Sequence, residues 1–115
     1  PFLRRLAMHT GIDFKAPYGA RVFATAPGTV LSAKRKGGYG KMVEIRHANG
    51  LSTRYAHLSK IEVRSGQRIK PGQLVGLVGS TGRSTGPHLH YETRLNKKPL
   101  DPRKFLRAGR QLGRL

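Results

Sequence analysis

The sequence predicts a single all-β domain built mainly from antiparallel sheet. Glycine and proline, at 15 and 7 of 115 residues, interrupt the chain at short intervals. The runs between them are rich in Val, Ile, Thr and Tyr, which favour strands. Before the C-terminus, no long segment repeats its apolar residues with the 3.6-residue period of a helix. The domain is expected to span residues 1–115, with a core over about 9–106 and a basic tail over 107–115.

Turn signals divide the chain into five runs that are expected to form strands. These runs are residues 21–26, 29–34, 42–47, 51–57 and 74–78. Asn49-Gly50 lies between the third and fourth runs and predicts a hairpin, because this pair suits a type I′ turn. Near the C-terminus, Asp101-Pro102 predicts the start of a short helix that ends close to Gly109.

The charge of the chain is strongly unbalanced, with 23 Lys and Arg against five acids and a net charge of +18. Such a surface attracts polyanions, whether nucleic acid, anionic lipid headgroups or acidic wall polymers. Without Trp, and with only four Tyr and four Phe spread along the chain, a single-strand nucleic-acid binder is disfavoured, because it would stack bases on aromatic residues. The absence of Cys excludes disulfides and thiolate metal sites. No apolar run approaches the roughly 20 residues of a membrane span.

The histidines carry the candidate chemistry. The segment His88-Leu89-His90-Tyr91-Glu92 alternates, so on a strand His88, His90 and Glu92 project from one face. Two imidazoles on one face can converge on a metal ion. A zinc ion held by His, His and Asp keeps its fourth position open for water, as catalytic sites require. Spacing alone also fits scattered structural histidines.

Other polar residues have less specific patterns. By the same alternation, Thr53, Tyr55 and His57 are expected to share one face of their strand. His47, at the end of its strand, is interpreted as structural. For Glu92, a hydrogen bond to a metal ligand and a plain cross-strand ion pair are both open. Tyr55 and Thr85 are assigned packing and turn roles rather than a place in the site.

Four motifs together point to a known family. They are HTGIDF at 9–14, PYG at 17–19, YAHL at 55–58 and GSTGRSTGPHLHYE at 79–92. In this order they resemble the M23 metallopeptidases, the lysostaphin-like or LytM-type peptidoglycan endopeptidases. The resemblance runs from about residue 9 to residue 102.

The resemblance implies a role for each motif residue. His9, Asp13 and His90 match the family's zinc ligands, which implies one zinc ion per chain. His57 and His88 match its two catalytic histidines that do not bind the metal. None of these five positions is substituted, which disfavours a degenerate, non-catalytic branch.

The implied function is a zinc metalloendopeptidase that hydrolyses peptide cross-links of bacterial peptidoglycan by a metal-activated water, in an open groove. The cross-link is expected to be D-alanyl–diaminopimelate rather than a glycine bridge. One of His57 and His88 is expected to take the water proton and the other to bind the oxyanion; which does which is open. The alternative is a non-catalytic wall-binding or amidase-activator module of the same fold.

The resemblance also implies where the protein works and what it meets. Its partner is expected to be peptidoglycan, with anionic wall polymers attracted by the basic surface and no nucleic acid. The location is expected to be the bacterial periplasm, cell envelope or exterior. The chain is expected to be a domain of a longer protein, with any membrane contact made through upstream segments.

Overall fold

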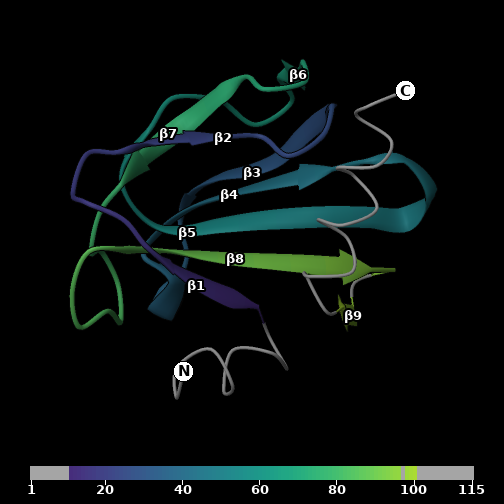
Figure 1. The fold of residues 1–115 in the computed structure, drawn as a ribbon. Coiled ribbons are helices and arrows are strands. Elements are labelled where there is room, and N and C mark those ends of the chain that lie inside the picture. Colours follow the sequence, from purple (N-terminus) through teal and green to yellow (C-terminus); the bar gives the residue numbers. More distant parts are fainter. Residues whose placement is uncertain (1–10, 97, 101–115) are drawn as a thin grey trace.

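The computed structural model describes residues 11–96 and 98–100 as one sheet of nine strands with two short 3-10 turns (Figure 1). The strands are β1 (Ile12–Lys15), β2 (Arg21–Phe23), β3 (Gly28–Arg35), β4 (Lys41–Arg46), β5 (Leu51–Ile61), β6 (Arg68–Ile69), β7 (Leu74–Val78), β8 (His88–Leu95) and β9 (Lys98–Leu100). The 3-10 turns are η1 (Gly37–Tyr39) and η2 (Ala48–Gly50). Every strand pair is antiparallel. The all-β prediction is confirmed.

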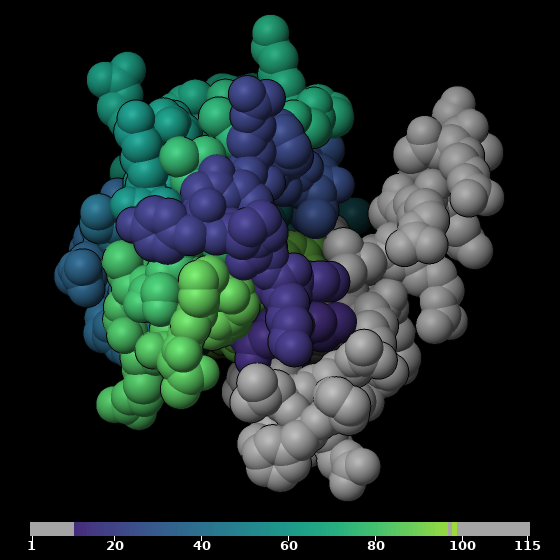
Figure 2. All heavy atoms as spheres, turned by 60° about the vertical axis from the view of Figure 1, so that its left-hand side comes forward, coloured from purple at the N-terminus to yellow at the C-terminus, as the bar shows by residue number. Residues whose placement is uncertain are grey.

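The strand order places the sequence motifs side by side. The main path runs β1-β8-β5-β4-β3-β6, while β2 pairs with β7 and β7 also pairs with β5. Figure 2 shows the N-terminal strands, in purple, beside the green segment that leads into β8. The first and last motifs of the sequence therefore meet at one edge of the sheet. Among the described residues, no helix is long and apolar enough to cross a membrane.

The five expected strands all form, four of them with shifted ends. Residues 74–78 match β7, while the run 51–57 extends to residue 61 in β5 and the run 21–26 shortens to three residues in β2. Three short strands of two to four residues, β1, β6 and β9, were not expected from the sequence. The expected C-terminal helix and the basic tail lie outside the described residues.

The hairpin between β4 and β5 has the predicted turn. Asn49 adopts φ 61° and ψ 34°, and Gly50 adopts φ 79°. The N–H of Leu51 donates to the Ala48 carbonyl across them. Both central residues thus have the left-handed conformation of a type I′ turn.

The two faces of the sheet differ in chemistry. One face carries the apolar core, in which Val22 of β2 and Val75 of β7 pack with Val43 of β4 and other buried side chains. Tyr55 and Tyr91 lie directly opposite each other on this face, and the Thr25 hydroxyl hydrogen-bonds both phenol oxygens. Because side chains alternate along a strand, His90 and Glu92 of β8 point to the other face. The polar face is where the expected site lies.

Strand β5 changes partner in the middle of its length. Its residues up to Ala56 pair with β8, whereas Leu58 and the residues after it pair with β7. His57 stands between the two, and its φ of 61° is in the left-handed region that residues with a Cβ seldom adopt. The strand therefore bends at His57, at the fork between β7 and β8.

Candidate functional site

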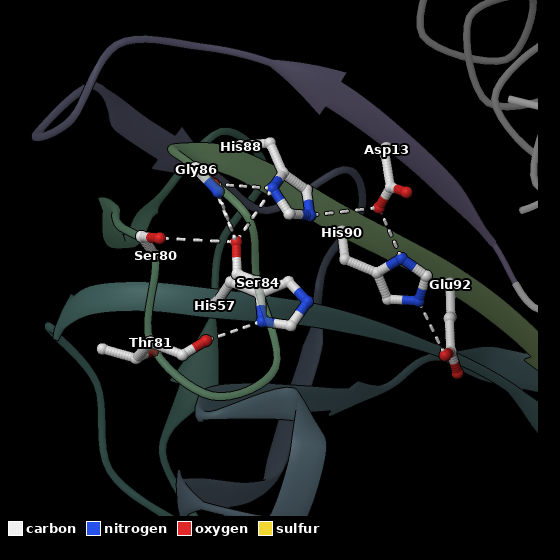
Figure 3. Close-up of polar contacts among 9 residues, drawn as sticks. All are labelled: Asp13, His57, Ser80, Thr81, Ser84, Gly86, His88, His90 and Glu92. Atoms are coloured by element: carbon white, nitrogen blue, oxygen red, sulfur yellow. Dashed lines mark hydrogen bonds and ion pairs between the residues drawn. The ribbon is translucent and has the colours of Figure 1, made fainter. Parts of the chain in front are cut away.

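Asp13 and His90 meet across the β1–β8 pair. They are direct partners in the register, so both side chains stand on the same face of the sheet. Asp13 Oδ1 lies 2.8 Å from His90 Nδ1 (Figure 3). Both side chains are largely buried, at 23% and 14% exposed. Two atoms that bind zinc well therefore lie next to each other.

His88 adds a second imidazole to the same carboxylate oxygen. Its Nε2 lies 3.4 Å from Asp13 Oδ1. Its Nδ1 lies 2.9 Å from the Gly86 carbonyl oxygen and 3.2 Å from Ser84 Oγ. Because a carbonyl can only accept, Nδ1–H donates to Gly86, and Nε2 is the nitrogen that faces Asp13.

His57 reaches this face through a backbone feature that its sequence neighbours do not indicate. Its ring centre lies 4.8 Å from that of His88 and 6.0 Å from that of His90. The expectation that it shares a face with Thr53 and Tyr55 was wrong, because the left-handed φ at His57 interrupts the alternation. A non-glycine residue in this conformation is strained, and such strain is frequent at functional sites.

The hydrogen bond and burial of His57 suit a neutral imidazole. Its Nδ1–H donates to the Thr81 carbonyl oxygen at 2.7 Å, which leaves Nε2 unprotonated (Figure 3). Burial lowers the pKa of His57, and the hydrogen bond that the ring donates to the Thr81 carbonyl opposes this only in part. At neutral pH the ring is therefore able to accept a proton.

Glu92 is buried behind His90, with 2% of its surface exposed. Its Oε2 lies 2.9 Å from His90 Nε2, and its Oε1 pairs with Arg94 at 3.2 Å. The ion pair with Arg94 runs along β8 rather than across strands, and the hydrogen bond joins Glu92 to His90, the expected ligand. Burial lowers the pKa of His90, but its hydrogen bonds to Glu92 and Asp13 outweigh this and raise it. Burial alone would raise the pKa of Glu92, yet its bonds to His90 and Tyr39 bring it below the usual value.

Three further residues belong to this network and were missed in the sequence. The Tyr39 hydroxyl donates to Glu92 Oε2 at 2.9 Å, and Arg54 donates to the Tyr39 oxygen at 3.1 Å. The Thr81 carbonyl holds His57. Tyr39 is 53 positions from Glu92, so no local spacing could reveal the pair. Only the strand register could have pointed to this network, because it places Arg54 directly opposite Glu92.

His47, Tyr55 and Thr85 take the non-catalytic places expected for them. His47 Nδ1 lies 2.7 Å from the Pro27 carbonyl oxygen and its Nε2 lies 2.8 Å from Thr53 Oγ1. The Tyr55 side chain is in the core, and Thr85 is exposed in the segment before β8.

A pocket of about 330 Å³ lies away from the histidine cluster. It is lined by Pro27, Gly28, Thr29, Arg46, His47, Arg68 and Ile69. Both ring nitrogens of its one histidine are already hydrogen-bonded. The pocket thus offers no acid–base group, and the cluster on β1, β5 and β8 remains the candidate site.

The expected ligand His9 lies outside the described residues. Within 11–96 and 98–100, no three His, Asp or Glu side chains are arranged to hold a metal ion by themselves. Of the expected ligand set, this part of the chain brings Asp13 and His90 together and places His57 and His88 beside them.

Comparison with known proteins decides the family. Residues 7–102 match the family described as Peptidase family M23. The chain belongs to peptidase family M23. This confirms the resemblance inferred from the motifs, and the M23 match covers all five positions singled out in the sequence.

The M23 chain is similar to several named peptidases. It is 54% identical over 102 residues to the DD-carboxypeptidase/endopeptidase Mpg of Neisseria meningitidis, covering 89% of this chain and 24% of Mpg. The chain thus spans about a quarter of that relative. It is 44% identical to a zinc-containing peptidase from Vibrio cholerae, with a TM-score of 0.78 over 81% of this chain and 29% of the other. The catalytic domain of lysostaphin from Staphylococcus simulans is 36% identical, with a TM-score of 0.82 over 86% of this chain and 79% of the lysostaphin domain.

Proposed function

We propose that this M23 domain is a zinc-dependent endopeptidase that hydrolyses peptide cross-links of peptidoglycan in the bacterial cell envelope. The observation that carries the proposal is the meeting of Asp13, His57, His88 and His90 on one face of the sheet, drawn from three strands. A binding module needs no such cluster, whereas amide hydrolysis needs a positioned acid, base and electrophile. Its presence supports the enzyme over the non-catalytic module.

The described residues fit zinc in their chemistry. Asp13 and His90 supply a carboxylate and an imidazole within 2.8 Å of each other. His90 turns its other nitrogen to the buried Glu92 carboxylate at 2.9 Å. Metal-binding histidines commonly have such a partner, which fixes the ring orientation and raises its basicity. We assign Asp13 and His90 as ligands, with His9 as the third and one ion per chain.

The reaction divides between the metal and the unligated histidines. When bound, zinc would lower the pKa of a water molecule toward about 7 and polarise the scissile carbonyl. His57 or His88 accepts the proton of the attacking water at Nε2, and this proton passes to the leaving amine as the C–N bond breaks. The other histidine, with a proton on each ring nitrogen, donates from Nε2 to the developing oxyanion. The neutral ring favoured at His57 by burial suits the proton acceptor.

The substrate is proposed to be the D-alanyl–diaminopimelate cross-link. The support is the 54% identity to Mpg, whose name describes a DD-carboxypeptidase/endopeptidase. The net charge of +18 would add attraction to anionic wall polymers in the periplasm or outside the cell.

Two purified muropeptide dimers test this function, one cross-linked by D-alanyl–diaminopimelate and one by a glycine bridge. We expect the chain to cleave the dimer cross-linked by D-alanyl–diaminopimelate, with products identified by mass spectrometry. A chelator should stop this cleavage, and added zinc should restore it. His88→Ala should be inactive, while the matched control His47→Gln should cleave normally at a temperature where it is folded. Binding to sacculi without cleavage of either dimer would instead identify the non-catalytic module.

A further inference from the structure

Tyr39 lies in the short turn η1 between β3 and β4, far in sequence from every histidine of the site. We propose that Tyr39 is a positioning residue: its hydroxyl holds Glu92 so that Glu92 fixes the orientation of His90. This inference rests on the proposed function in taking His90 as a zinc ligand. It assigns a role in metal binding and catalysis to a residue that touches neither metal nor substrate.

The Tyr39 hydroxyl lies between a cation and an anion. Arg54 donates to its oxygen at 3.1 Å, and the Arg54 guanidinium also lies 5.2 Å from the centre of the Tyr39 ring. The hydroxyl in turn donates to Glu92 Oε2 at 2.9 Å. Because Arg54 can only donate, the single phenolic proton is directed to Glu92. The Arg54 Nε is itself paired with Glu44 at 3.3 Å, which anchors the cation.

One oxygen of Glu92 receives both Tyr39 and His90. Oε2 lies 2.9 Å from the Tyr39 oxygen and 2.9 Å from His90 Nε2. Glu92 is buried, so a lost hydrogen bond cannot be replaced freely by bulk water. Without the Tyr39 hydroxyl, His90 would be the one remaining described donor to that oxygen. Arg94 would still hold Oε1 of Glu92, but Oε2 could swing about that contact. The aim of His90 Nδ1 toward Asp13 would then loosen.

The turn that carries Tyr39 is itself held against the segment that orients His57. The N–H of Arg83 donates to the Gly38 carbonyl at 2.8 Å. The backbones of Gly40 and Gly82 approach so closely that a Cβ on either would collide with the other segment. Tyr39 therefore cannot follow Glu92 if the carboxylate moves, because its backbone is fixed. This rigidity is what allows a single hydroxyl to set the position of Glu92.

The expected size of the effect follows from comparable groups. Removing a partner of a metal ligand typically costs about 10–100-fold in metal affinity or activity. The Tyr39→Phe variant keeps the ring and its packing and removes only the hydroxyl. The complete chain is therefore compared as wild type, Tyr39→Phe, Glu92→Gln and the double variant. Tyr18→Phe is the matched control, since Tyr18 is 68% exposed.

We expect Tyr39→Phe to bind zinc about 10-fold more weakly in competition with a chromophoric chelator, and kcat to fall with little change in KM. Because Tyr39 acts through Glu92, the same change should cost less than about 2-fold in the Glu92→Gln background. Tyr18→Phe should match wild type. Equal losses in both backgrounds would mean that Tyr39 stabilises the fold generally, and no loss in either would refute the proposal outright.

The failure of this inference and that of the proposed function can be told apart. A wild-type chain that binds zinc but cleaves no muropeptide overturns the function, while the zinc affinities still decide the role of Tyr39. In the metal-free protein, the ¹⁵N signal of His90 Nε2 should also shift in Tyr39→Phe and remain unchanged in Tyr18→Phe. An unchanged His90 signal in Tyr39→Phe would contradict the proposal without reference to activity.

Discussion

Replacing His57 with glycine is expected to give a more stable protein than replacing it with alanine, although glycine ordinarily weakens a strand. His57 has φ 61°, and this left-handed conformation costs a residue with a Cβ roughly 1–2 kcal/mol. Glycine avoids that cost, against the roughly 0.5–1 kcal/mol by which it destabilises a strand relative to alanine. The balance favours His57→Gly by about 0.5–1 kcal/mol.

The comparison isolates the backbone because both variants lose the same side-chain contacts. Each loses the hydrogen bond to the Thr81 carbonyl, worth about 1 kcal/mol, so this loss cancels between them. Urea unfolding of the two metal-free variants measures the difference, which corresponds to roughly 2–5 °C in melting temperature. If the alanine variant were equally stable or more stable, His57 would not be strained. The account of how it reaches the face of His88 would then be refuted.

The same two variants test the role of His57. Both should keep zinc at the wild-type level, because His57 is assigned no bond to the metal. Both should lose about 10²–10⁴-fold in turnover, the usual cost of removing a general base or acid. Loss of zinc from either would make His57 a ligand.

Three further predictions address the fold, the edge strand and the surface. His47→Gln should cost about 1–3 kcal/mol at pH 8. Burial lowers the pKa of His47 below 6.5, so as the pH falls His47 is protonated in the unfolded wild-type chain before it is protonated in the folded one. The difference in free energy of unfolding between wild type and His47→Gln, measured in urea, should therefore shrink from pH 7 to pH 5. A difference that stays constant over this range would contradict the prediction. Gly11→Ala should weaken zinc binding and stability together, because its Cβ would lie 3.0 Å from His90 Cε1 and 2.8 Å from Glu92 Cγ and displace β1 with Asp13. Binding to intact sacculi should weaken as salt rises, while cleavage of a soluble muropeptide dimer changes much less; equal sensitivity would deny the basic surface a recruiting role.

The part of the fold that follows local rules could be predicted from the sequence. Asn49-Gly50 forms the expected type I′ turn because both residues tolerate positive φ. The alternation of His88 and His90 holds because β8 is a regular strand. By contrast, β1 has four residues and depends on its pairing with β8, so its own sequence carries little signal.

The parts of the site that depend on tertiary structure could not be predicted. His57 departs from its alternation because β5 changes partner at that residue, and partner exchange leaves no mark in a local pattern. Tyr39 meets Glu92 across 53 positions, and their contact exists only once β4, β5 and β8 have paired. The motif residues were identified through their family resemblance. The groups that orient them, such as Tyr39 and the Thr81 carbonyl, become visible only in the folded structure.

The central claim is that His90 binds zinc and His88 does not. The most direct test measures the zinc bound per chain in His88→Ala and in His90→Ala, by atomic emission on folded protein. The two histidines are two residues apart on one face of β8 and within 3.4 Å and 2.8 Å of the same Asp13 oxygen, yet only His90 is assigned to the metal. The account predicts that His88→Ala keeps close to one zinc ion per chain and that His90→Ala loses most of it. Zinc retained in His90→Ala and lost in His88→Ala would contradict the account and exchange the two roles.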